Sequence, residues 1–206
     1  PDVMNKVVVM FSQNLIIGAE DGIYARRSTQ DEWQRVAETS GPVDALISPD
    51  AAIASANDEI WFSTEGFTWT LIGSISGRTV NELAKHRSQI LVATDEGLYG
   101  DSGNFYAESA SIALINFLGD ASESREVIVN DVISNFTTAV ATFSDGRYLV
   151  WDDTGYVLVD VEEFSTIHKA IFVGTDIWAF SYDEFAIRGD DAIRRLVTGK
   201  RIAPNG

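Results

Sequence analysis

The sequence contains no cysteine, and this absence excludes several kinds of chemistry. Disulfide bonds, thiolate metal sites and a cysteine nucleophile all require the missing thiol group. The chain has only two histidines, His86 and His168, so a histidine-rich metal site is excluded as well. A glycine-rich phosphate-binding loop is also missing. We therefore expect no bound metal and no cofactor.

The chain also lacks a long apolar run. The nearest candidate, residues 6–20, is interrupted by Ser12, Gln13 and Asn14, so we expect no membrane-spanning segment and no membrane partner. The N-terminus has no basic segment followed by an apolar stretch and a cleavage site. These features predict cytoplasmic synthesis without a signal peptide.

Basic residues are scarce. Lys and Arg together number 15, against 31 acidic residues, which gives a net charge of −16 at pH 7. Affinity for the phosphate backbone comes largely from Lys and Arg, so we expect no direct binding of nucleic acid. The charge would suit a passage through which nucleic acid slides without sticking, and solubility is the simpler explanation.

Two segments of the chain are similar to each other. They are VNELAKHRSQILVATDEGLYG, from residue 80, and VNDVISNFTTAVATFSDGRYLV, from residue 129. Three further copies begin at residues 4, 43 and 167. Acidic turn residues recur at nearly the same spacing and provide an independent test of the alignment. These residues are Asp21, Asp58, Glu96, Asp145 and Asp183.

Each repeat divides into four short segments rich in β-branched and aromatic residues, separated by turn formers. No stretch has convincing helical periodicity. Units of four strands spaced by about 40 residues are typical of β-propeller blades. The sequence therefore predicts one all-β domain over residues 1–206, a five-bladed β-propeller of four-stranded antiparallel blades. The chain ends should meet and close the ring. The expected blades cover residues 4–40, 41–76, 77–118, 127–162 and 163–199, with a polar insertion at 119–126.

The segments NLIIGAEDGIYARRSTQDEW, EIWFSTEGFTW and ILVATDEGLYGDSGNFY resemble the repeats of a broad group of propellers that carry Asp-box-like turns. That group includes sialidases, lectin-like propellers, photosystem-assembly propellers and propeller domains of bacteriophage tail proteins. The resemblance covers nearly the whole chain and implies the fold rather than an activity.

The heptapeptide STEGFTW, residues 63–69, is similar to the Asp-box of this group, Ser-x-Asp-x-Gly-x-Thr-Trp. The match is degenerate, because Glu replaces Asp and the tryptophan comes one residue early. In the family this box is a structural turn between the outer two strands, on the face away from the usual active site. We expect the same role here, with the hydroxyl and carboxylate accepting local N–H groups and the tryptophan packing between blades. The matching residues are Ser63, Glu65, Gly66, Thr68 and Trp69.

The sequence does not support an enzyme. Resemblance to sialidases would imply an arginine triad and a Tyr/Phe-Arg-Ile-Pro segment near the start, and that segment is absent. No serine lies in a nucleophile-elbow pattern. A pair of carboxylates for glycoside hydrolysis depends on a separation in space that the sequence does not give. We therefore expect no catalytic residues.

Two sets of recurring polar residues are candidate sites. The second position of each repeat is placed to surround the mouth of a central channel and hold a small ligand or cation. The alternative is hydrogen bonding to the backbone of neighbouring blades. The candidates at the channel mouth are Asn5, Asp44, Asn81, Asn130 and His168. The turns between second and third strands should gather carboxylates on one face, which either binds a basic partner or is only solvated. The acidic face comprises Glu20, Asp21, Asp58, Glu59, Asp95, Glu96, Asp145, Asp183 and Glu184.

The C-terminal stretch has the opposite charge. We interpret it as a basic tail that docks on a neighbour, with a frayed terminus as the alternative. Its docking residues are Arg194, Arg195, Lys200 and Arg201.

Together these features predict a non-catalytic propeller that serves as a protein-interaction or structural module of a larger assembly. Its partners would be other protein subunits, and within the resemblance a bacteriophage tail, hence a virion, suits an acidic propeller without cysteine. The alternative is a glycan-binding, lectin-like propeller, followed by an Asp-box glycoside hydrolase. Fold alone does not decide between these functions.

Overall fold

The computed structural model of the chain describes its residues in ten segments. These are residues 7–11, 14–27, 31–47, 51–87, 89–101, 112–135, 137–160, 164–174, 176–186 and 193–202. The described backbone forms five antiparallel sheets and one short helix, α1 (Ala121–Glu126).

The five sheets follow one another along the chain. The first contains β1 (Val7–Phe11), β2 (Asn14–Ala19), β3 (Gly22–Arg26) and β4 (Gln34–Ala37). The second contains β5 (Val43–Ile47), β6 (Ala52–Ala56), β7 (Glu59–Ser63) and β8 (Thr70–Ser74). The third contains β9 (Val80–His86), β10 (Gln89–Thr94), β11 (Gly97–Asp101) and β12 (Ile112–Leu114). The fourth contains β13 (Val129–Ser134), β14 (Ala139–Phe143), β15 (Arg147–Asp152) and β16 (Gly155–Asp160). The fifth contains β17 (Lys169–Val173), β18 (Asp176–Ala186) and β19 (Ile193–Ile202).

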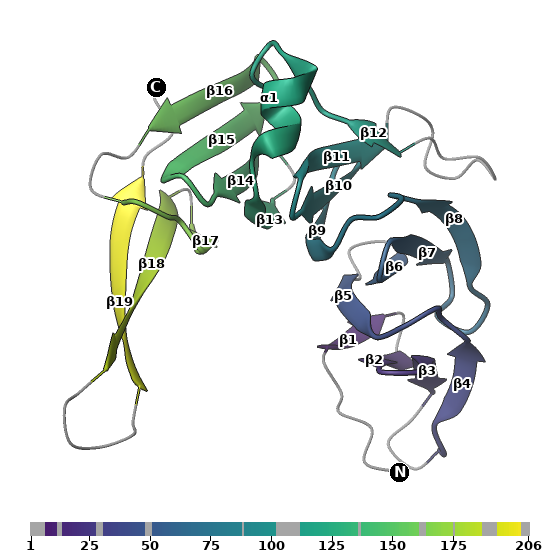
Figure 1. Ribbon diagram of the computed structural model, residues 1–206. Helices are drawn as coiled ribbons and strands as arrows, with labels where there is room; N and C mark the ends of the chain where they lie inside the picture. The colour runs from purple at the N-terminus through teal and green to yellow at the C-terminus, as the bar shows by residue number, and fades with distance from the viewer. Residues whose placement is uncertain are drawn as a thin grey trace.

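The sheets stack face to face along an arc (Figure 1). In each sheet the strands pair in sequence order, and the first strands of successive sheets, such as β9 and β13, contact each other. Backbone hydrogen bonds join the turn after the second strand to the connection between sheets. Asp95 donates its N–H to Thr79, and Ser144 donates to Ile128. This arrangement of four-stranded antiparallel sheets is the blade organisation predicted from the repeats.

The hydrophobic core lies between the sheets, because alternate side chains of a strand point to opposite faces. Four clusters of buried residues join the first sheet to the second, the second to the third, the third to the fourth and the fourth to the fifth. Ile53 is fully buried between the second and third sheets, and Phe143 between the third and fourth. Each sheet is therefore stabilised mainly by its neighbours along the arc.

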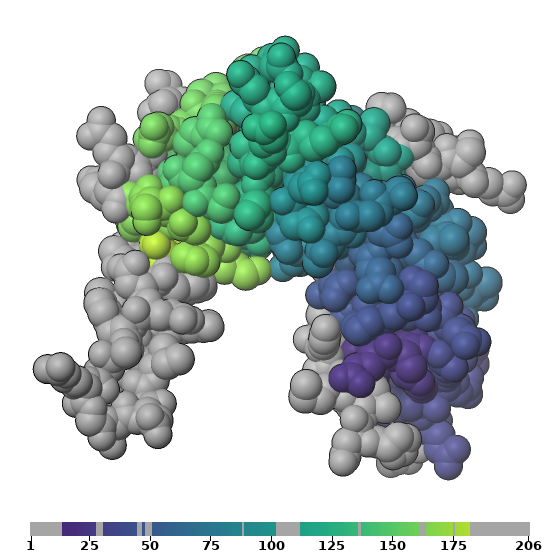
Figure 2. All heavy atoms as spheres, viewed as in Figure 1, coloured from purple at the N-terminus to yellow at the C-terminus, as the bar shows by residue number. Residues whose placement is uncertain are grey.

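The predicted closed ring does not form. The first and fifth sheets stand at opposite ends of an open arc, with space between them in both views (Figures 1 and 2). A ring of five blades closes only if the rotations between successive blades add up so that the fifth blade packs on the first, and here these two sheets stand apart. The sequence counts repeats but contains no direct measure of this angle. The fifth sheet also has three strands among the described residues, whereas four were predicted.

The polar insertion predicted at 119–126 contains the helix α1, which the analysis of periodicity did not detect. Six residues are too few to show an apolar stripe. A capping signal was nevertheless present, since Asp120 accepts the N–H of Ser122 and Glu123 lies in the first turn. No helix in the described part of the chain is long and apolar enough to cross a membrane.

Candidate functional site

The Asp-box-like segment forms the turn between β7 and β8, the outer strands of the second sheet, as predicted. Ser63 Oγ accepts the N–H of Gly66 at 2.8 Å and that of Glu65 at 3.3 Å. The Glu65 carboxylate departs from the expectation, because it accepts the hydroxyl of Thr68 rather than a backbone N–H. Trp69 donates its indole N–H to the carbonyl of Gly66 and is buried between the first two sheets.

This turn is held against the first sheet. Asn14 Nδ2 donates to the carbonyl of Glu65 at 2.8 Å. Gly66 has a φ of 86°, and a Cβ there would lie 2.9 Å from Cδ1 of Ile16. Glycine allows both the left-handed backbone and the close approach of the two sheets. The turn therefore presents Phe67 at the junction of the first and second sheets.

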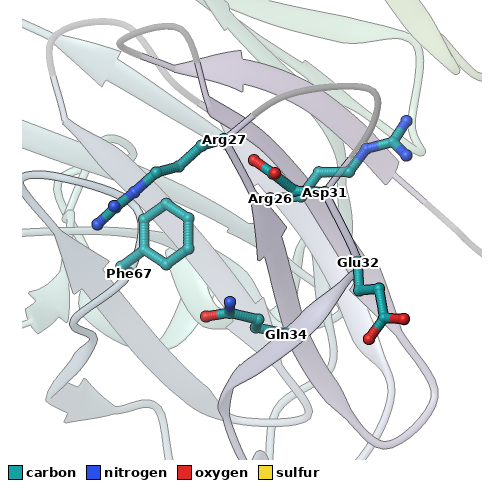
Figure 3. A pocket seen from close by; sticks show the side chains of 6 residues that line it. All are labelled: Arg26, Arg27, Asp31, Glu32, Gln34 and Phe67. Carbon is teal, nitrogen blue, oxygen red and sulfur yellow. The ribbon is translucent and has the colours of Figure 1, made fainter.

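A groove of about 320 Å³ opens at this junction (Figure 3). Its first wall comes from the end of β3, the two residues before Trp33 and the first residue of β4, and its second wall is Phe67 from the β7–β8 turn. The lining residues are Arg26, Arg27, Asp31, Glu32, Gln34 and Phe67.

Two arginines of the groove lie over aromatic rings. The guanidinium carbon of Arg27 is 4.9 Å from the centre of the Phe67 ring, and that of Arg26 is 4.5 Å from the Trp33 ring. Such contacts favour one placement of a guanidinium while leaving its N–H edge able to donate. The lining thus combines donors, the carboxylate acceptors of Asp31 and Glu32, and an aromatic surface. The sequence analysis did not identify this groove, although the RR and DEW segments near an aromatic turn were the available signal.

Two of the predicted channel-mouth residues link neighbouring sheets. Asn81 Nδ2 donates to the carbonyl of Val129 in the fourth sheet, and Asn130 Nδ2 donates to the carbonyl of Ile167 before the fifth, both at 2.8 Å. This is the structural alternative considered for these positions. Asp44 accepts the N–H of Asn57 within its own sheet.

His168 and Asn5 complete this set. The backbone N–H of His168 donates to the carbonyl of Phe180. Asn5 lies outside the described residues. Binding of a small ligand at this ring therefore remains untested.

The residues that follow Asn81, Asn130 and His168 form a charged cluster that the sequence analysis missed. Lys169 Nζ lies 3.0 Å from Glu82 Oε2 and 2.9 Å from Asp131 Oδ1, so one ammonium joins the innermost strands of the third, fourth and fifth sheets. Asp131 is 1% exposed, and its second oxygen accepts the N–H of Ala170 at 2.9 Å. The signal was an acid, an acid and a base at the third position of three successive repeats.

Burial controls the protonation of this cluster. Desolvation raises the pKa of Asp131, although the N–H of Ala170 and the charge of Lys169 oppose the rise. Burial alone would lower the pKa of Lys169, but the carboxylates of Asp131 and Glu82 outweigh it and raise that pKa. The described residues contain no group of three or more His, Cys, Asp or Glu side chains that could hold a metal.

The predicted acidic face is partly neutralised by local partners. Asp21 lies 4.0 Å from Arg35, Glu96 lies 2.9 Å from Arg78, and Asp145 Oδ2 accepts Arg147 Nε at 2.8 Å. Each of these carboxylates therefore has an arginine close to it. The three arginines reduce the negative potential that was expected to attract a basic partner.

Other carboxylates of this face bond to neutral groups. Tyr24 donates its hydroxyl to Asp21, and this hydrogen bond raises the pKa of the tyrosine. Glu59 accepts the indole N–H of Trp61 at 3.0 Å and the N–H of Ser40 at 3.2 Å. Asp95 accepts the N–H of Thr79. Glu20 lies in the turn between β2 and β3 and Asp58 in the turn between β6 and β7, as predicted. A docking role for this face stays a prediction.

The last two acids are not in a turn. Asp183 and Glu184 lie within β18, which continues to Ala186, so their predicted place at the turn of the fifth repeat was wrong. Their backbone pairs with Leu196 and Arg195 of β19. β18 therefore continues past the acidic pair, which the spacing of acidic residues did not reveal.

The predicted basic tail is part of a strand. Its four residues lie in β19, which pairs with β18 over ten residue pairs, so they are not a free or frayed end. Their side chains lie outside the described residues. The positions concerned are Arg194, Arg195, Lys200 and Arg201.

One serine and one histidine approach each other in the described structure. His86 Nδ1 lies 3.2 Å from Ser134 Oγ, and burial, with a smaller effect of Arg87, lowers the pKa of His86. Ser134 donates its hydroxyl to the carbonyl of Asn135 at 2.6 Å, which leaves that proton engaged with the backbone. The pair links the third and fourth sheets.

Comparison with solved structures places this fold among known ones. The β-propeller domain of Cps50 (Swd1) from Myceliophteria thermophila matches 97% of this chain with a TM-score of 0.64 and 10% identity. The WD40 domain of Neurospora crassa Pan2 matches 96% with a TM-score of 0.63 and 11% identity. The structure of YCF48 bound to D1 peptide matches 88% with a TM-score of 0.60 and 12% identity. The neighbours are β-propellers.

The likeness concerns the fold alone, because identity is low. No protein-family model and no curated protein matches this sequence. The chain is shorter than the propellers it resembles: it spans 71% of the Cps50 domain and 62% of both the Pan2 domain and YCF48. For the extracellular domain of BT4673 from B. thetaiotaomicron, this share is 28%. Propeller neighbours and sheets of four antiparallel strands thus agree with the predicted fold class, while the number of blades stays a prediction.

Proposed function

We propose that the chain is a non-catalytic propeller module that binds another protein subunit of a larger assembly through the groove between its first two sheets. The observation that carries the proposal is the lining of that groove, where Arg27 lies over the ring of Phe67 and where Asp31 and Glu32 supply carboxylates (Figure 3). Arginine and aromatic residues are enriched at the energetic centres of protein interfaces.

The chemistry of the groove fits a peptide segment. A peptide offers N–H donors, C=O acceptors and side chains of both charges, and the groove offers carboxylates, guanidinium groups and the Gln34 amide. The peptide bound to YCF48, a protein of similar fold, supports a protein partner. A bacteriophage tail is the assembly that the resemblance of the repeats implies, and the identity of the recovered partner tests it.

The proposal is tested by co-purification with two charge-reversal variants. Arg27→Glu removes the cation over Phe67 and reverses the charge at one wall of the groove, so we expect recovery of the partner to fall by about tenfold or more. Arg125→Glu makes the same change on the exposed surface of α1, outside the groove, and should leave recovery unchanged. Equal recovery with both variants, at unchanged thermal stability, would overturn the assignment of the groove.

A saccharide is the second candidate for the same groove. The carboxylates of Asp31 and Glu32 can accept hydrogen bonds from sugar hydroxyls. The Gln34 amide can donate and accept hydrogen bonds, and Phe67 offers an aromatic face. An array of immobilised oligosaccharides, probed with the chain and with Phe67→Ala, separates the two functions. If the chain binds an oligosaccharide and Phe67→Ala abolishes that binding, the result favours the lectin. If no oligosaccharide is bound and a protein co-purifies with the chain, the result favours the interaction module.

A further inference from the structure

Successive sheets meet through one repeated contact. A large apolar side chain on the second strand, five residues before the turn acid, points toward the following sheet. It is Ile16 in the first sheet, Ile53 in the second, Leu91 in the third and Val140 in the fourth, and none of the four is more than 1% exposed. Each lies in the buried cluster shared with the next sheet.

The following sheet places a smaller side chain in the same buried cluster. The next residue along the same strand points the other way, toward the preceding sheet. It is Ala54 in the second sheet, Val92 in the third, Ala141 in the fourth and Ala179 in the fifth, all buried in the cluster shared with the preceding sheet. We call the face of a sheet toward the following sheet its front and the face toward the preceding sheet its back. A large side chain on the front and a smaller one on the back of the next sheet have complementary volumes, as dense packing requires.

The fifth sheet has the large front but nothing described in front of it. Trp178 occupies the position of Ile16, Ile53, Leu91 and Val140, yet it is only half-buried. Ile171 lies directly opposite it on β17 and is 45% exposed, and Val173 on the same face is 53% exposed.

The equivalents of Ile171 in earlier sheets are covered. Ile47, Ala84 and Ile133, each opposite the large residue of its own sheet, pack into the cluster shared with the next sheet. The end of the arc therefore exposes a surface whose four counterparts are interfaces.

The arc leaves room for such a neighbour. The fifth sheet stands at one open end of the arc, away from the first sheet (Figure 1). Five sheets correspond to 71% of the Cps50 propeller, so a ring of that size has space for about two further sheets.

We propose that the front face of the fifth sheet, formed by Ile171, Val173 and Trp178, binds a propeller-type sheet of a partner polypeptide whose contacting strand carries small apolar side chains. The partner sheet continues the interface that the chain itself forms four times. This surface is separate from the groove between the first two sheets and does not depend on its function.

A single thiol tests the proposal, because the chain has no cysteine of its own. Val173→Cys reports on the front face, and Leu71→Cys, 46% exposed on β8, is the matched control. Packing at an interface excludes reagent, so maleimide should label Val173→Cys about tenfold more slowly in the complex from the native source than in the purified chain. Leu71→Cys should react at the same rate in both.

The contacting residue is then mapped by a short bifunctional crosslinker attached at the same thiol. A crosslink to a β-strand with alternating small apolar residues in another polypeptide supports the proposal. A crosslink to a helix or loop, or equal labelling of Val173→Cys with and without the partner, overturns it. Slow labelling of the purified chain that depends on its concentration would assign the face to a second copy and also overturn it.

Charge insertion separates this surface from the groove. Val173→Lys alters a half-exposed residue, so the fold should persist while the sheet partner is lost. Arg27→Glu should leave that partner bound. Loss with Arg27→Glu but not with Val173→Lys would contradict the proposal while supporting the groove.

Discussion

Asp131 joins the innermost strands of the fourth and fifth sheets through a single carboxylate. It is buried, bonds Lys169 and accepts the N–H of Ala170. Asp131→Ala would leave that N–H and the ammonium without their buried partner, so we expect the free energy of unfolding to fall by about 3 kcal/mol. Urea denaturation followed by fluorescence measures the change.

Two variants calibrate that loss. Asp131→Asn keeps an oxygen that can accept from Ala170 and should cost less than the alanine variant. Glu82→Gln alters the partly exposed partner of Lys169, whose pairing is worth about 1 kcal/mol or less. If Asp131→Ala cost no more than Glu82→Gln, the buried carboxylate would not be the centre of the cluster.

His86 should make stability depend on pH. Burial lowers its pKa below the usual value of about 6.5, so the unfolded chain binds the proton more readily than the folded chain does. Its contribution to stability is then complete above about pH 6.5 and is lost as the pH falls through the lowered pKa. Urea midpoints measured from pH 7.5 to pH 5.5 should decline, and His86→Gln, which does not titrate, should flatten the decline. An unchanged slope would show that other groups cause it.

For single residues, the sequence predicted which positions lie at the sheet junctions better than it predicted which side chains they contact. The second position of each repeat was identified, and Asn81 and Asn130 do lie at sheet junctions. The adjacent charged residues were missed because an acid on one blade and a lysine two blades away become partners only when the inner strands converge. The groove residues Arg27 and Phe67 were missed because they belong to different sheets and meet only where the first two sheets pack together.

The turn between the second and third strands of a sheet packs closely against the connection to the next sheet. Gly146, in the turn between β14 and β15, has a φ of 83°, and a Cβ there would lie far too close to the carbonyl oxygen of Phe164. Gly146→Ala should therefore destabilise the chain by about 2 kcal/mol or more. Gly77→Ala is the control, since Gly77 has a φ of 74° but no atom within 4 Å of the added Cβ, and should cost only about 1 kcal/mol.

Thermal unfolding of both glycine variants separates backbone strain from the close approach. Equal losses would mean that the connection at Phe164 moves away without cost. The repeats and their Asp-Gly turn were readable from the sequence, because turn chemistry is local. The extension of β18 past Asp183 was not, because strand length depends on pairing with β19.

The open arc is a property of the whole molecule that no single repeat encodes. The angle between sheets depends on the volumes that meet across each interface, such as Leu91 against Ala141. Repeat counting predicted antiparallel sheets that follow one another along the chain, as the described residues show, but ring closure depends on the sum of the angles between successive sheets. The prediction of a closed ring therefore failed while the prediction of stacked sheets succeeded.

Stacking in sequence order makes stability depend on nearest neighbours. Ile177→Ala opens a cavity only between the fourth and fifth sheets, so hydrogen exchange should accelerate mainly in β17 and β18. Leu91→Ala removes a similar volume between the third and fourth sheets and should accelerate exchange in both of them. Each cavity costs about 2–5 kcal/mol, but the end sheet can open alone whereas a central sheet cannot. If Ile177→Ala lowered protection equally in every sheet, the arc would unfold as one cooperative unit, and the nearest-neighbour account would be wrong.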